Sequence, residues 1–512
     1  MASVSSAPKN IGSRLELFVD DWLIDRLSGA KQCLHHPVPQ EVALLCDRPW
    51  EGNETHQFTC LRDIGGLYRM YYEASHATFD KQGNIVDRTP MYTCYAESRD
   101  GIHWTRPSLG LFEAAGTRDN NVVLTPELAG AGTVNFVPFV DPRPGVPRDE
   151  RYKGVGGLGG QGGMFAFVSP DGIHWRKMGD EAIISKGDFD AKNVVFWDAE
   201  RGEYRAYKRE RRIAAYQAGI DDVRGASVKT DDLTGLTEDG LDNGRDISTC
   251  ASQDFVHWTE PRLLSYTPSR VNELYENHVQ PYYRAPHVLL SFPTRYIDRG
   301  WTAAAEALPQ LEHRRMRFSG DPRGGTALTD CMLMSSRDRE HFSVWPESFI
   351  RPGLRLKDNW TYGDNFVAYG MIETASSIIG APDEISIYAT EAYYQSGPSR
   401  LRRFTIRVDG FVSVRAPLCG GEMLTRPLVF EGSELVMNYS TSAAGSVQVE
   451  LQDAQGIPLP GFALADSEVM YGDSLEQPML WKNNPDLATW AGTPVRLRFV
   501  LKDADLFSLR FR

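Results

Sequence analysis

"SRDGIHWTRP", residues 98–107, is the stretch that decides the fold, because close copies of it return three times along the chain. The copies are "SPDGIHWRKM" at 169–178, "SQDFVHWTEP" at 252–261 and "SSRDREHFSVWP" at 335–346. In each copy a Ser-x-Asp pair predicts a tight turn, since both side chains can accept hydrogen bonds from nearby backbone N–H groups. A short β-rich run precedes every turn. The four phrases therefore indicate one repeated β unit.

The spacing of the four phrases indicates the kind of repeat. Their serines, Ser98, Ser169, Ser252 and Ser336, stand 71, 83 and 84 residues apart, which suits four-stranded propeller blades with long loops. A fifth unit, "NFVAYGMIET" with "EISIYATEAYY", has the same strand pattern but lacks the phrase. The prediction is an all-β fold with a five-bladed β-propeller over residues 46–415.

The two ends of the chain differ from the repeated units. Residues 1–45 form an N-terminal segment in which "RLELFVDDWLI", residues 14–24, is the candidate for the strand that closes the propeller. Residues 420–512 contain alternating strands between Gly, Pro and Asp turns and no further copy of the phrase. This pattern predicts a C-terminal β-sandwich. Helical periodicity is scarce; "TAAAEALPQLEHRRM", residues 302–316, predicts a short helix on an insertion.

Composition excludes several classes of function. The 512 residues carry a net charge of −13, which opposes binding to nucleic acid. Seven cysteines without a CxxC pair indicate neither a disulfide framework nor a zinc site. Neither a signal peptide nor a run of 18 apolar residues is visible, so we expect a cytoplasmic protein with no membrane partner. Assembly into a homo-oligomer is left open.

Motifs of other enzyme classes carry little weight. "GVGGLG", residues 154–159, matches GxGxxG, but no helix follows it to bind a pyrophosphate, so we reject a nucleotide site. The tryptophans of the repeated phrase, Trp104, Trp175 and Trp258, could stack on sugars. Because they recur at one position of each unit, packing between blades is the favoured interpretation.

The beginnings of the innermost strands are the expected place for chemistry, because polar groups there converge on one mouth of the propeller channel. Carboxyl groups can protonate or attack a glycosidic bond, amides and histidines bind hydroxyls, and aromatic rings stack on sugars. The candidate catalytic residues are Asp190, Glu273, Glu54, Asp21 and Asp364. The candidate substrate-binding residues are His56, Asn135, Lys192, Asn193, Tyr275, Glu276, His278, Trp360 and Tyr362.

Asp190 and Glu273 lead this set, and we expect both to face a pocket beside Trp360 and Tyr362. A general acid there needs a pKa raised by burial or by a neighbouring carboxylate. No metal ligands and no cofactor are predicted, although a structural Ca²⁺ in the channel is left open.

Five segments carry a family resemblance: "LFVDDWLI" at 17, "PWEGN" at 49, "DERYK" at 149, "VQPYYRAPH" at 279 and "NWTYGDN" at 359. With them the chain resembles the five-bladed propeller glycoside hydrolases of families 32, 43, 62, 68 and 130, and most of all a group of bacterial family-32-like proteins. The resemblance implies an aspartate nucleophile or base on blade one, a second aspartate on blade two and a glutamate acid on blade three.

This sequence departs from that plan. The family's "NDPNG", "RDP" and "ECP" signatures are missing, and the blade starts offer Glu54 or Asp21, then Asn135, then Asp190. The expectation is a glycoside hydrolase with a carbohydrate substrate and paired carboxyl groups. Two alternatives stay open: a phosphorylase or uronate lyase, in which His56, Lys192, His278 and Arg284 hold an anion, and a non-catalytic glycan-binding propeller.

Overall fold

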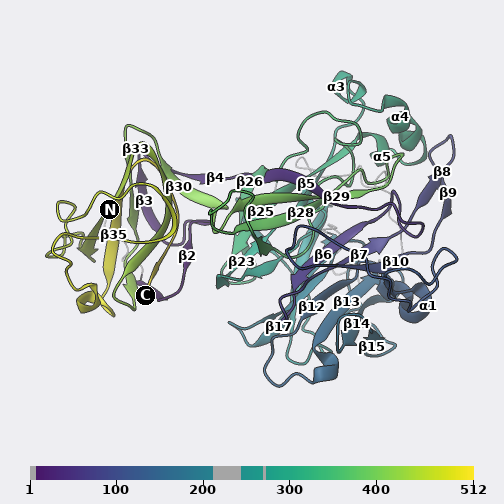
Figure 1. Ribbon diagram of the computed structural model, residues 1–512, viewed down its shortest axis with the longest axis horizontal. Helices are drawn as coiled ribbons and strands as arrows, with labels where there is room; N and C mark the ends of the chain where they lie inside the picture. The colour runs from purple at the N-terminus through teal and green to yellow at the C-terminus, as the bar shows by residue number, and fades with distance from the viewer. Residues whose placement is uncertain (1–6, 212–243, 269–271) are drawn as a thin grey trace, which may run out of the picture. The chain divides into compact units, whose positions relative to one another are not determined.

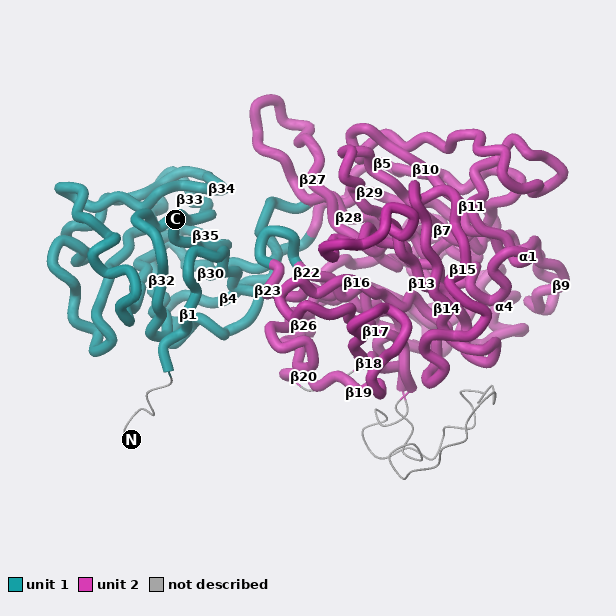
Figure 2. Tube along the Cα trace, turned by 90° about the horizontal axis from the view of Figure 1, so that it is seen from below, with its two compact units in different colours: residues 1–36, 282–285, 406–512 teal, residues 37–281, 286–405 magenta. Residues whose placement is uncertain are grey.

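The computed structural model describes residues 7–211, 244–268 and 272–512. Regular structure in these residues is almost entirely β (Figure 1). The chain divides into two compact units, shown in Figure 2. Unit 1, the C-terminal unit, comprises residues 1–36, 282–285 and 406–512, and unit 2, the propeller unit, comprises residues 37–281 and 286–405.

Four sheets of the propeller unit have four strands each, in a ring typical of a propeller. In three of these sheets the strands lie in chain order, so each is a meander, whereas one strand of the fourth sheet comes from the N-terminal part of the chain. The first sheet contains β6 (His56–Arg62), β7 (Tyr68–Ala74), β10 (Tyr92–Ser98) and β11 (Val122–Leu124), and the second contains β12 (Val137–Val140), β13 (Tyr152–Leu158), β14 (Gly163–Ser169) and β15 (Arg176–Lys177). The third contains β16 (Val194–Asp198), β17 (Glu203–Arg211), β18 (Arg245–Ser252) and β19 (Arg262–Leu263). The last contains β27 (Ile372–Thr374), β28 (Glu384–Glu391), β29 (Arg400–Arg407) and β5 (Val38–Leu45).

A seven-stranded sheet stands between the third and the last of these. The regular four-stranded blade therefore occurs four times and not the predicted five. Pro293 separates β23 from β24: it cannot donate to a strand ladder, and the two strands on either side of it pair with different parts of the long strand β25. The strands are β20 (Ser265–Thr267), β21 (Glu273–Leu274), β22 (Gln280–Tyr282), β23 (Ala285–Ser291), β24 (Thr294–Asp298), β25 (Ala327–Ser336) and β26 (His341–Ile350).

The strand that completes the last blade comes from the N-terminal part of the chain, but it is not the predicted one. β5, residues 38–45, pairs with β29. Within residues 14–24, β2 (Glu16–Leu17) pairs instead with β35 of unit 1. Phe18 packs into the core of that unit, and burial of this apolar segment holds it there.

The repeated phrase forms the predicted turn in all four copies. In the first, Oδ1 of Asp100 accepts the N–H groups of Ile102 and His103, and Oγ of Ser98 accepts the N–H of Gly101. The same contacts surround Asp171 and Asp254, and Asp338 accepts the N–H of His341 at 2.7 Å. These hydrogen bonds confirm the turn.

Two of the tryptophans that follow the turns, Trp104 and Trp175, pack between blades, as predicted. Trp104 of the first blade lies edge-on to Tyr388 of the last, with ring centroids 5.9 Å apart. Trp175 of the second blade meets Tyr71 of the first at 6.1 Å. Edge-to-face pairs of this kind add stability beyond the area they bury. These rings are structural.

Helices are few and short. The helix predicted over residues 302–316 is divided into α3 (Ala303–Glu306) and α4 (Leu311–Gly320), because Pro309 between them cannot continue the helical hydrogen bonds. The other α-helices of the described residues are α1 (Pro126–Ala129) and α5 (Arg323–Thr326). A hairpin of β8 (Ala77–Phe79) and β9 (Ile85–Arg88) extends from the first blade. No helix of the described residues is long and apolar enough to span a membrane.

Unit 1 is built from one ten-stranded sheet, where the sequence predicted a sandwich. β35 pairs along its length with five other strands and so connects the sheet around a buried apolar core. The strands are β1 (Lys9–Gly12), β2 (Glu16–Leu17), β3 (Ile24–Ser28), β4 (Lys31–Leu34), β30 (Val412–Ala416), β31 (Gly421–Thr425), β32 (Leu428–Phe430), β33 (Leu435–Asp453), β34 (Asp473–Pro478) and β35 (Val495–Phe511).

Candidate active site

His56 and Glu73 form the centre of the candidate site. His56 begins β6 and lies opposite Glu73, near the end of β7, in the strand register. Nδ1 of His56 donates to the carbonyl oxygen of Glu54 at 2.9 Å and lies 3.8 Å from Oε1 of Glu73. Burial lowers the pKa of His56 to about 4. His56 is therefore neutral at pH 7, and the ring of Tyr393 packs against it at 4.7 Å.

Glu73 is a buried acid that holds its proton. Its Oε2 accepts the backbone N–H of Asn135 at 2.9 Å. Burial, with a smaller contribution from the nearby carboxyl groups of Glu54 and Asp190, raises the pKa of Glu73 to about 8. The hydrogen bond from Asn135 opposes this rise. Protonated at neutral pH, Glu73 has the property required of a general acid.

Sequence reasoning missed Glu73 because it considered only the starts of the inner strands. The signal was present: Glu73 is the one acidic residue in "YRMYYEA", a strand that is buried almost throughout. A carboxyl group in such a run is rarely buried without a partner or a function.

Three donors fix the carboxylate of Glu54. Oγ of Ser75 donates to Oε2 at 2.9 Å, and Nη2 of Arg88 lies 2.9 Å from Oε1, which also accepts the hydroxyl of Tyr394. Arg88 is 40% exposed. It thus connects the buried Glu54 to solvent.

Asn135 and Asn193, both predicted to bind substrate, hold the backbone instead. Asn135 takes a positive φ of 56°, and its amide donates to the carbonyls of Gly157 and Phe189. The amide of Asn193 also donates to Phe189, while its oxygen accepts the N–H of Arg209. Their side chains are occupied in positioning the starts of the second and third blades.

Buried charged groups from three blades form an ion cluster. Nζ of Lys192 donates to the carbonyl of Phe58, and burial lowers the pKa of Lys192 to about 7 against the attraction of Glu276 and Glu73. Nε2 of His278 lies 3.1 Å from Oε2 of Glu276. Burial opposes ionisation of Glu276, but His278, Lys192 and His56 together lower its pKa. Two buried glutamates near one lysine therefore have pKa values shifted in opposite directions.

Asp190 and Glu273, the two leading candidates, lie at the rim. The Asp190 side chain is 57% exposed, and its Oδ2 is 3.1 Å from Nη1 of Arg209, which also pairs with Asp188. The Glu273 side chain is 30% exposed and pairs with Nη1 of Arg245 at 2.6 Å. Both acids are thus arginine-paired and open to solvent, and neither is the buried acid that the sequence predicted.

Tyrosines lie beside these ion pairs. The hydroxyl of Tyr362 donates to that of Tyr275 at 2.7 Å, and the guanidinium groups of Arg209 and Arg245 lie 4.9 and 5.0 Å from the ring centre of Tyr275. This arrangement agrees with the predicted proximity of Tyr362. Trp360 differs, because its indole donates to the carbonyl of Gly353 in its own loop.

Three further candidates lie elsewhere. Asp364 is fully buried in the last blade, where burial and Glu391 raise its pKa well above the usual range and its Oδ1 accepts the N–H of Ala392. Asp21 was wrongly placed: it belongs to unit 1, 80% exposed and 3.9 Å from Arg426, because its segment does not close the propeller. Arg284 is also in unit 1, paired with Asp409 and Glu476.

No group of three or more His, Cys, Asp or Glu side chains in the described part of the chain could hold a metal ion. The polar groups of the site are joined in ion pairs and hydrogen bonds that include lysine and arginine at every level.

No family model matches the chain. A stretch of 141 residues, 27% of the chain, is 28% identical to the uncharacterized protein Rv1502 of Mycobacterium tuberculosis (strain ATCC 25618 / H37Rv) and covers 38% of that protein's length. The uncharacterized protein MT1551 of strain CDC 1551 / Oshkosh matches over the same length at the same identity.

Three solved structures are similar to the structure of this chain. A glycoside hydrolase is 12% identical with a TM-score of 0.43, over 72% of this chain and 92% of that one. A thermostable family-43 glycoside hydrolase is 11% identical with a TM-score of 0.40, over 73% and 94%. The fructofuranosidase from Schwanniomyces occidentalis complexed with fructose is 10% identical with a TM-score of 0.35, over 92% and 97%. At such identities the likeness does not extend to catalytic residues or substrates.

Proposed function

We propose that this chain is a glycoside hydrolase acting on a glycan or oligosaccharide, with Glu73 as general acid and Asp190 as the second carboxyl group, which acts as base or nucleophile. The raised pKa of Glu73 is the observation that carries this assignment. Glycosidases need one carboxyl group that keeps its proton at working pH and another that does not.

The surroundings of each carboxyl group support its role. Glu73 is buried between neutral His56 and the backbone of Asn135, so little solvent competes for its proton. Asp190 is open to solvent and paired with Arg209, so a water molecule or a sugar can reach its carboxyl group. Asp190 contributes to the raised pKa of Glu73.

Neighbouring groups fit the binding of a sugar. Arg88, partly exposed and held by Glu54, can donate to substrate hydroxyls, and the rings of Tyr393 and Tyr394 lie beside it. Glu273 and Tyr275, joined through Arg245, form a second group of hydroxyl partners. Aromatic faces with acids and arginines around them are typical of sugar recognition.

A screen of aryl furanosides and pyranosides, run beside natural polysaccharides with product analysis, tests the proposal. The expected result is release of a reducing sugar without added phosphate and without an unsaturated product absorbing in the ultraviolet. Phosphate-dependent turnover indicates a phosphorylase, an ultraviolet-absorbing product indicates a lyase, and glycan binding without products indicates a binding propeller. Any of these three outcomes rejects hydrolysis.

Asp190→Asn then tests the role of Asp190 on the substrate found. Loss of the carboxylate should lower kcat by roughly 10²- to 10⁴-fold and leave binding largely intact. Asp47→Asn is the matched control, because Asp47 is 53% exposed and arginine-paired through Arg106 but contacts none of the residues above. Equal activity of the two variants would reject Asp190.

A further inference from the structure

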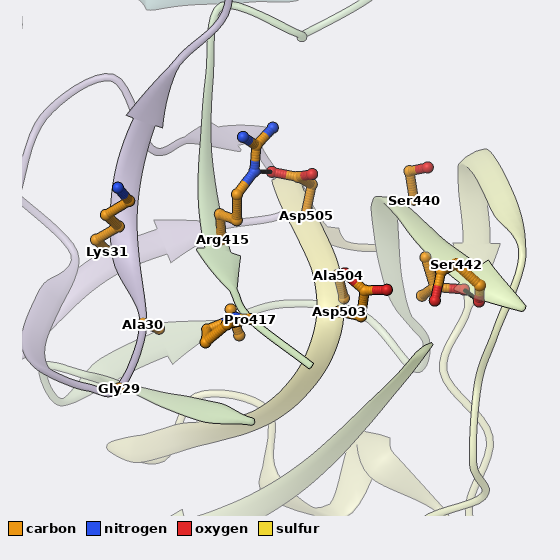
Figure 3. Close-up of a pocket in the computed structure, with 12 residues that line it drawn as sticks. Gly29, Ala30, Lys31, Arg415, Pro417, Ser440, Ser442, Asp503, Ala504 and Asp505 are labelled. Carbon is orange, nitrogen blue, oxygen red and sulfur yellow. Dashed lines mark hydrogen bonds and ion pairs between the residues drawn. The ribbon is translucent and has the colours of Figure 1, made fainter. Parts of the chain in front are cut away.

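The C-terminal unit contains a cavity of about 750 Å³, formed by β4, β30, β33 and β35 with the adjoining turns (Figure 3). Its lining belongs entirely to unit 1. A volume of this size is within the range of small-molecule binding sites. No aromatic side chain lines it, and its apolar groups are the small side chains of Ala30, Ala416, Pro417 and Ala504.

Four strands bring a row of polar side chains to this cavity. In the strand register Lys31 lies opposite Arg415, Arg415 opposite Asp505, and Asp505 opposite Ser440. Residues that are directly opposite on neighbouring strands point to the same face of a sheet. The row therefore crosses the cavity wall, and Figure 3 shows these side chains on adjacent strands.

One basic residue of this row, Lys31, has no acidic partner in the described chain. Nε of Arg415 donates to Oδ1 of Asp505 at 2.8 Å, and the hydroxyl of Ser413 donates to the same oxygen. Lys31 faces Arg415, and like charges directly opposite each other destabilise a sheet. Lys31 makes no ion pair with an acidic residue of the described chain, so an anionic ligand would relieve this repulsion.

The other side of the cavity offers hydrogen-bond acceptors and hydroxyls. Asp503 takes a positive φ of 41° in β35, opposite a bulge of β33 in which the four residues between Thr441 and Ser446 have no register partner. Asp503 and Ser442 line the cavity there. The carboxylate of Asp503 pairs with no basic group of the described chain, which leaves it able to accept hydrogen bonds from a ligand.

We infer that this cavity binds an acidic sugar. The carboxylate of the sugar meets Lys31 and Arg415, and its hydroxyls donate to Asp503, to Ser442 and to Oγ of Ser440, whose own O–H donates to Asp473. A sugar acid matches both sides, because it carries one anionic group and several hydroxyls on one ring. The inference concerns unit 1 alone and does not depend on the proposed hydrolase.

Isothermal titration of the full chain with three sugars of the same ring tests this inference. The probes are glucuronate, glucose and glucosamine, which are anionic, neutral and cationic at pH 7. Glucuronate is expected to bind roughly tenfold more tightly than glucose, because a charge-assisted hydrogen bond is stronger than a neutral one. Equal binding of glucuronate and glucose, or tighter binding of glucosamine, overturns it.

Variants place the binding in this cavity. Lys31→Gln should weaken glucuronate roughly tenfold and leave glucose unchanged. Lys502→Gln is the matched control: Lys502 is an exposed lysine of the same unit that does not line the cavity. Asp190→Asn separates this site from the propeller, because it should not alter glucuronate binding. Loss of binding in Asp190→Asn with retention in Lys31→Gln rejects the cavity, and acetate binding as tightly as glucuronate rejects recognition of the sugar.

Discussion

Glu73→Gln is the substitution that best separates catalysis from structure. Glutamine keeps the shape of the side chain and an oxygen to accept the N–H of Asn135, but it has no acidic proton. If Glu73 is the general acid, kcat should fall by roughly 10²- to 10⁴-fold. The basic limb of the pH profile of kcat/KM, expected near pH 8 from the pKa of Glu73, should disappear.

The same substitution should change how stability depends on pH. The pKa of Glu73 is raised in the folded protein from 4.5 to about 8. Between these values the unfolded chain has lost the proton that the folded protein retains, so the free energy of unfolding of the wild type falls as pH rises. At 1.36 kcal/mol for each pKa unit, the loss approaches about 5 kcal/mol by pH 8. Glu73→Gln removes it.

Thermal unfolding at pH 5 and pH 8, with activity measured in parallel, checks both effects. The variant should gain stability relative to the wild type as pH rises while it loses activity. Glu51→Gln is the control, because Glu51 is a buried acid of the same region whose pKa burial also raises, but it contacts Tyr72 and Arg106. Activity of Glu73→Gln close to that of Glu51→Gln would refute the assignment of Glu73.

The remaining predictions concern the pH dependence of stability, the repeated turns and the close approach of Gly370 to Cys60. Because the pKa of His56 is lowered to about 4, the wild type should lose about 3 kcal/mol of unfolding free energy as pH falls from 6.5 to 4. His56→Gln should not show this loss. Equal pH dependence of the melting temperatures of variant and wild type contradicts the prediction. Asp100→Ala should cost about 1–2 kcal/mol in urea unfolding, because two N–H groups lose their acceptor, and Asp254→Ala should cost the same; a neutral effect at both removes the turn's role in stability. Gly370→Ala should cost more than about 2 kcal/mol, since its φ is +103° and an added Cβ would meet the carbonyl oxygen of Cys60; a wild-type melting temperature would count against this packing.

The repeated architecture could be predicted from the sequence because its cause is local. A Ser-x-Asp pair folds its own turn with its own side chains, so four copies of the phrase mark four turns wherever the blades lie. The alternation of apolar and polar residues likewise indicates strands without knowledge of their partners. Local chemistry was enough for the all-β class and for the order of the units.

The candidate site could be predicted only in part. His56, Glu54, Lys192 and Glu276 were identified from their positions before or at strand starts, and the fold brings them together. Their electrostatic state was not predictable, because it depends on burial and on charges from other blades. The exposed pairing of Asp190 with Arg209 is decided in the same way.

Tertiary structure alone decided the rest. Segment 14–24 and β5 are both strands near the N-terminus, and only the partners β35 and β29 assign one to unit 1 and the other to the last blade. In the sequence Glu73 is only a glutamate in a tyrosine-rich strand. The fold places it opposite His56, where its carboxyl group accepts the N–H of Asn135. The sequence determines which segments are strands, whereas the pKa of a buried carboxyl group depends on what the other blades place around it, and that is a property of the assembled propeller.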